Sequence, residues 1–100
     1  MKVRLPWFVE KVERYDPEFY KRVKSVVEVA MKPGALDTKT KILITLALDA
    51  FKGADQGVKV LAAQAREVGA TDEEIAEALR LAYYVSGMDV IKTSLNAFHD

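Results

Sequence analysis

Apolar side chains recur at spacings of three and four residues along most of the chain, and this periodicity is the strongest constraint on its fold. One stripe follows Asp16-Pro17-Glu18, a triplet typical of a helix start because aspartate accepts from free backbone N–H groups and proline fits the first helical position. This stripe comprises Phe19, Tyr20, Val23, Val26, Val27 and Ala30. No segment alternates with period two for long, so the sequence predicts an all-α fold with short turns.

Glycine, proline and capping residues divide the chain into about six predicted helices. These helices open at or near Pro6, Pro17, Asp37, Asp55, Thr71 and Met88. Pro33-Gly34 is expected to end the second helix, and Gly53 and Gly69 the third and fourth, since glycine readily adopts the left-handed conformation that follows a helix. Gly87 is expected to separate the fifth helix from a sixth that runs to Phe98.

The fifth predicted helix begins with a capping box. Thr71 is expected to accept from a backbone N–H of the first turn, while Glu74 reaches back to the N–H of Thr71. Glu73, Glu74 and Glu77 lie in the first two turns, where carboxylates favour the helix dipole, so we interpret them as a solvated face. The spacing Ala65, Gly69 and Ile75 resembles a helix-turn-helix, but acidic residues at the start of the second helix would repel phosphates. A helical hairpin with a glycine turn is therefore expected.

The third predicted helix is apolar on nearly all sides. Leu43, Leu46 and Ala50 lie on one face, while Ile44, Leu48 and Phe51 form a second. Five other short helices can cover one side of it, and the remainder would leave a large apolar patch in water. We therefore expect a homo-oligomer in which a second copy covers part of this helix.

Composition excludes several classes of function. With 100 residues, half of them apolar, the chain is expected to form one ordered domain over residues 1–100. It has no cysteine, which excludes disulfides and thiol redox chemistry, and its single histidine, His99, excludes a histidine-rich metal site. The 15 basic and 15 acidic residues balance, which argues against nucleic-acid and anionic-membrane partners. No metal and no cofactor are expected.

Two further expectations concern the setting of the protein. Lys2 and Arg4 are followed by Pro6, Trp7 and Glu10 rather than by an apolar export segment, and the apolar run 42–51 is too short to cross a bilayer. A cytoplasmic location is therefore expected. Charged residues make up 30% of the chain, and asparagine and glutamine are scarce, which favours a thermophilic source.

Two aspartates and a tyrosine are the candidate catalytic groups. Asp49 lies among apolar neighbours, where a buried carboxylate must be paired or protonated, so it could face a pocket or a subunit interface. Asp55 is predicted to be the N-cap of the fourth helix, whose N-terminus could also receive an anionic ligand. Tyr83 falls on the core stripe and Tyr84 points off it; packing is the expected role of both, with one phenol donating into a cavity as the alternative.

Residues 36–97 resemble a known family. The phrases that carry the resemblance are Ala35 to Lys41, Phe51-Lys52-Gly53, and Gly69-Ala70-Thr71-Asp72-Glu73-Glu74-Ile75. They are similar to the carboxymuconolactone decarboxylase family, which includes the AhpD-type alkylhydroperoxide reductases. The resemblance implies an AhpD-like helical domain and an assembly into trimers or hexamers.

The residues that perform the family's redox chemistry are missing. AhpD-like members place Cys-x-x-Cys at the start of the fourth helix, followed by a histidine, and a glutamate on the preceding helix; these positions hold Ala54, Gly57, Leu61 and Ile42. The resemblance therefore implies the fold and not the peroxidase activity. We expect an oligomer that binds a small acidic or apolar metabolite or is catalytically silent. The alternative is a non-redox lactone or decarboxylation-type enzyme that uses Asp49, Asp55 or a tyrosine as an acid–base group.

Overall fold

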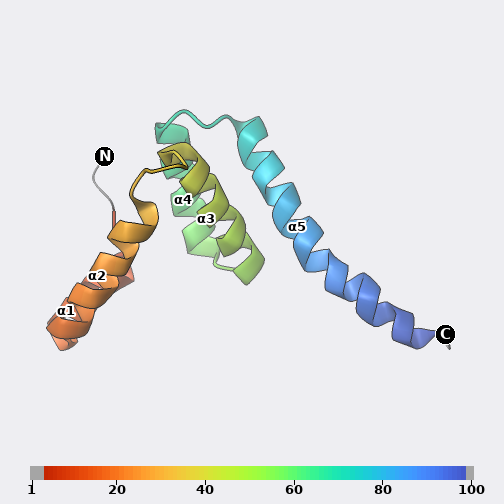
Figure 1. The fold of residues 1–100 in the computed structure, drawn as a ribbon, viewed down its shortest axis with the longest axis horizontal. Helices are drawn as coiled ribbons and strands as arrows, with labels where there is room; N and C mark the ends of the chain where they lie inside the picture. The colour runs from red at the N-terminus through yellow and green to blue at the C-terminus, as the bar shows by residue number, and fades with distance from the viewer. Residues whose placement is uncertain (1–3, 99–100) are drawn as a thin grey trace. The chain divides into compact units, whose positions relative to one another are not determined.

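The computed structural model describes residues 4–98, and all regular structure within them is helical (Figure 1). The elements are α1 (Trp7–Tyr15), α2 (Pro17–Met31), α3 (Thr38–Lys52), α4 (Asp55–Glu67), α5 (Asp72–Ser94) and the short 3-10 helix η1 (Leu95–Ala97). The all-α prediction is confirmed. The chain divides into two compact units, one ending at Thr38 and the other beginning at Lys39. That residues 1–100 form a single domain stays a prediction.

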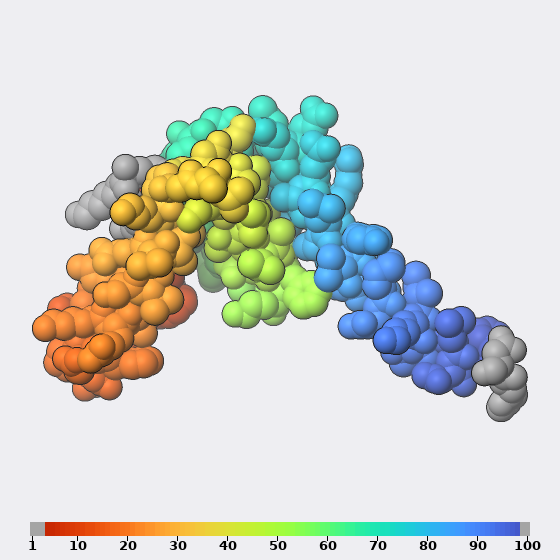
Figure 2. Space-filling view, viewed as in Figure 1, coloured from red at the N-terminus to blue at the C-terminus, as the bar shows by residue number. Residues whose placement is uncertain are grey.

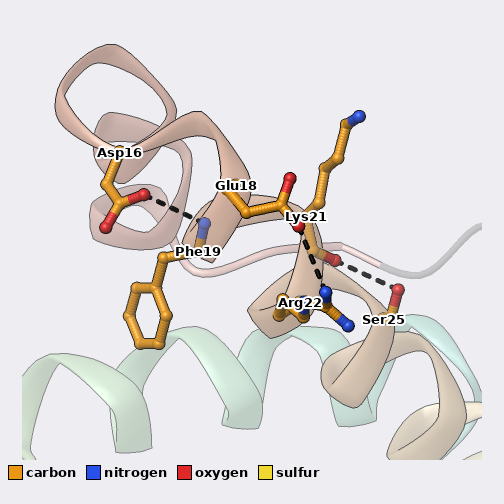
Figure 3. Close-up of polar contacts among 6 residues, drawn as sticks. All are labelled: Asp16, Glu18, Phe19, Lys21, Arg22 and Ser25. Atoms are coloured by element: carbon orange, nitrogen blue, oxygen red, sulfur yellow. Dashed lines mark hydrogen bonds and ion pairs between the residues drawn. The ribbon is translucent and has the colours of Figure 1, made fainter.

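In the first unit, α1 and α2 contact each other across a turn at Asp16. The Asp16 carboxylate accepts from the Phe19 N–H at 3.1 Å, as expected for the N-cap of a helix with proline in its first turn (Figure 3). Further along the same helix, the Arg22 guanidinium donates to Glu18 at 3.2 Å, one turn apart. Val9 of α1 is buried, and α2 ends at Met31, just before the predicted Pro33-Gly34.

In the second unit, α3 and α4 form a helical hairpin whose turn depends on Gly53 (Figure 1). Gly53 has φ +76°, and its N–H donates to the Ala50 carbonyl at 3.1 Å, while the Ala54 N–H donates to the Asp49 carbonyl at 2.9 Å. Gly69, between α4 and α5, has φ +94°. Both glycines thus occupy the left-handed region expected from the sequence.

The core of this unit is small and comes from all three long helices. Leu46 and Ala65 are fully buried, and the other buried side chains are Ile42, Ala70, Ile75 and Ala78. The capping box is present: the Glu74 N–H donates to Thr71 Oγ1 at 3.1 Å, and the Thr71 N–H donates to Glu74 Oε1 at 2.9 Å. Lys39 Nζ lies 2.8 Å from Glu74 Oε2, which connects the start of α3 to the start of α5.

The predicted break at Gly87 is wrong, because α5 continues through it for 23 residues. A glycine inside a helix lowers stability by only about 1 kcal/mol relative to alanine, which is too little to stop a helix by itself. Predicted helices five and six are therefore one helix, about 35 Å long, against about 22 Å for α3. Its second half extends beyond the rest of the unit (Figure 2).

The extension of α5 also changes the surroundings of its tyrosines. Tyr83 was expected on the core stripe, yet it is 71% exposed, and Tyr84 is 62% exposed. Ile75 and Ala78, two turns earlier, are buried as predicted. The predicted core stripe of α5 is thus correct for the part of the helix that lies beside α3 and α4. It is wrong for the part of α5 that extends beyond them.

Candidate functional site

The turn between α3 and α4 carries the positions that the family resemblance singles out. Ala54 is the residue before α4, with φ −83° and ψ 79° and no side-chain cap. Asp55 was predicted to be the N-cap, but it is the first helical residue, and its N–H donates to the Gly53 carbonyl at 3.0 Å. Its exposed carboxylate lies in the first turn, where negative charge complements the helix dipole.

Asp49 of α3 and Gly57 of α4 face each other across this turn. A Cβ atom built on Gly57 would lie 2.9 Å from Asp49 Cγ and closer still to Asp49 Oδ2. The Asp49 carboxylate therefore occupies the space that any side chain at position 57 would need. Both residues are half-buried, and each is four positions from Gly53.

The surroundings of the Asp49 carboxylate are polar on one side only. It lies against Gly57 in the first turn of α4, the positive end of the helix dipole. Within residues 4–98, no side chain donates a hydrogen bond to it or forms an ion pair with it. The carboxylate thus lies beside the start of α4 and is available to a ligand that donates a hydrogen bond.

The remaining positions of the redox motif are apolar. Ile42 is 3% exposed, so it belongs to the core and not to a proton relay. Leu61 is half-buried on α4, one turn beyond Gly57. Phe51, at the end of α3, is 53% exposed and so does not fill the interior. Neither thiol chemistry nor proton transfer is available from Ile42, Ala54, Gly57 or Leu61.

The candidate catalytic residues lie on three different helices. Asp49 is half-buried near the end of α3, Asp55 is exposed at the start of α4, and Tyr83 is exposed in the middle of α5. No hydrogen bond or ion pair between their side chains is present in the described part of the chain. Their catalytic roles stay predictions. His99 lies outside the described residues.

Sequence reasoning identified Asp49 but missed its contact with Gly57. The signal was available, because residues equidistant from the turn of an antiparallel helical hairpin face each other, and positions 49 and 57 are both four residues from Gly53. The described residues contain no cluster of three or more side chains of the types that hold a metal ion. None of the described helices is long and apolar enough to cross a membrane.

The helices α3, α4 and α5 define a fold of one helical hairpin followed by one long capped helix. Comparisons with known proteins identify the family to which this fold belongs. The model of the carboxymuconolactone decarboxylase family matches residues 17–100. The chain belongs to this family, in a form without cysteine. The match begins at α2, so α1 precedes the matched region.

Two relatives support this assignment. An uncharacterized protein of Methanocaldococcus jannaschii is 34% identical over 80 residues, which cover 80% of this chain and 75% of that protein. The crystal structure of an apo carboxymuconolactone decarboxylase family protein from Legionella pneumophila is similar with a TM-score of 0.72 and 32% identity, covering 85% of this chain and 76% of the other. The fold expected from the resemblance is therefore confirmed.

Proposed function

We propose that this protein is a non-redox member of its family, a homo-oligomer that binds a small molecule at the turn between α3 and α4. The observation that carries the proposal is the contact between Asp49 and Gly57, because a carboxylate takes the place of a side chain at the second cysteine position. The complete absence of cysteine supports the same reading, since a peroxidase of this type needs a reactive thiolate and a resolving thiol.

The chemistry at the turn favours a ligand with a hydrogen-bond donor next to an apolar part. The Asp49 carboxylate accepts hydrogen bonds and repels anions, while Leu61 and Phe51 offer apolar surface nearby in sequence. Of the acidic and apolar metabolites expected from the sequence, the apolar kind therefore fits better. A catalytically silent protein remains compatible with this site.

A second candidate function is supported by the lack of a side-chain partner for Asp49. A carboxylate that is half-buried and unpaired can act as a general acid or base on a lactone or a carboxylated substrate. Asp55 and Tyr83 are less suited to this role because both are exposed. An enzyme would turn over its substrate, whereas a binding protein would not. Asp49→Asn would abolish this turnover if the protein is an enzyme.

Two assays test the proposal. Peroxide consumption with a lipoamide-type dithiol as reductant should stay at the uncatalysed rate, and robust turnover would overturn the non-redox reading. A thermal-shift screen with short-chain alcohols and amines should raise the melting temperature of the wild type and of Asp55→Asn, but not of Asp49→Asn. If no compound shifts the wild type, the binding function is contradicted.

The proposed assembly rests on the second face of α3. Ile44, Leu48 and Phe51 are 45%, 58% and 53% exposed in the single chain, although their helix carries Ile42 and Leu46 in the core. Burial between copies stabilises by roughly 25 cal/mol per Å² of apolar surface. Leu48→Glu should lower the mass seen by light scattering, while the conservative Leu48→Met should not. A monomeric wild type at micromolar concentration would contradict the assembly.

A further inference from the structure

We draw no further inference here: the strongest candidate, the patch of exposed aromatic side chains that Trp7, Phe8 and Phe19 present on the hairpin of α1 and α2, carries none because nothing in the structure shows what covers it.

Discussion

Lys39 and Glu74 are 35 residues apart in the chain, yet Lys39 Nζ lies 2.8 Å from Glu74 Oε2 while Glu74 Oε1 accepts the N–H of Thr71. One carboxylate thus caps α5 and holds the first turn of α3. The hydrogen bond from Lys39, and then that from the Thr71 backbone, lower the pKa of Glu74 from its ordinary value of 4.5. Loss of its charge should loosen both helices together.

This pKa shift predicts a loss of stability in acid. Because the pKa is lower in the folded state, the stabilisation is complete above pH 4.5 and disappears as the pH falls through the folded value. The contribution of Glu74 to the melting temperature should therefore not vary with pH between 6 and 7 and should fall below pH 4.5. Glu74→Gln keeps a capping side chain but has no charge to lose, so its acid dependence should be weaker. Parallel pH profiles of the two proteins would contradict the prediction.

The capping box predicts the effect of removing one hydroxyl. Thr71→Ala leaves the Glu74 N–H without its acceptor, which should cost about 0.5–2 kcal/mol of unfolding free energy. Since about 1 kcal/mol corresponds to a shift of about 4–8 °C in a domain of this size, differential scanning calorimetry resolves it. Thr71→Ser keeps the acceptor and serves as the control. Equal melting of all three proteins would mean that the cap does not hold α5.

Gly69 predicts a backbone effect that contacts do not reveal. Its φ of +94° strains any residue with a side chain, although a Cβ there would meet nothing within 4 Å. Gly69→Ala should destabilise by about 1–2 kcal/mol. Gly34 is equally open but has no positive φ, so Gly34→Ala should be neutral or slightly stabilising. Urea denaturation of the two variants at one protein concentration makes the comparison.

The contact between Asp49 and Gly57 predicts strong coupling between two substitutions. Gly57→Ala should gain helix propensity but force Asp49 to move, which overpacks the turn. In an Asp49→Ala background the same change should stabilise by about 0.5–1 kcal/mol. A double-mutant cycle should therefore give a coupling energy of about 1–2 kcal/mol. Additive effects would show that the two residues do not touch in solution.

Most helix boundaries were predictable because local chemistry determines them. Asp16, Gly53, Gly69 and Thr71 each act on backbone groups within a few residues, so their roles are visible in the sequence. Gly87 differs from the other two glycines in its backbone, because it stays helical within α5 while Gly53 and Gly69 have positive φ. Asp89 follows Gly87 at the same spacing as Asp55 follows Gly53 and Thr71 follows Gly69, so the local sequence alone does not reveal that α5 is a single helix.

The errors at the site have a different cause. The exposure of Tyr83 depends on how far α3 and α4 extend alongside α5, which no local pattern records. Asp55 was misplaced by one residue because the Gly53 turn leaves Ala54 in the capping position. The position of the Asp49 carboxylate depends on a helix pairing, and only the three-dimensional arrangement brings it to Gly57.

Asp49 and Gly57 also constrain which substitutions position 57 can accept. A cysteine introduced at position 57 by a single substitution would meet a carboxylate already in its place, and the negative charge beside it would disfavour the thiolate on which the family's redox chemistry depends. Position 49 would have to change first, at the expense of whatever the carboxylate now does. Thiol chemistry at position 57 therefore requires a change at position 49 as well.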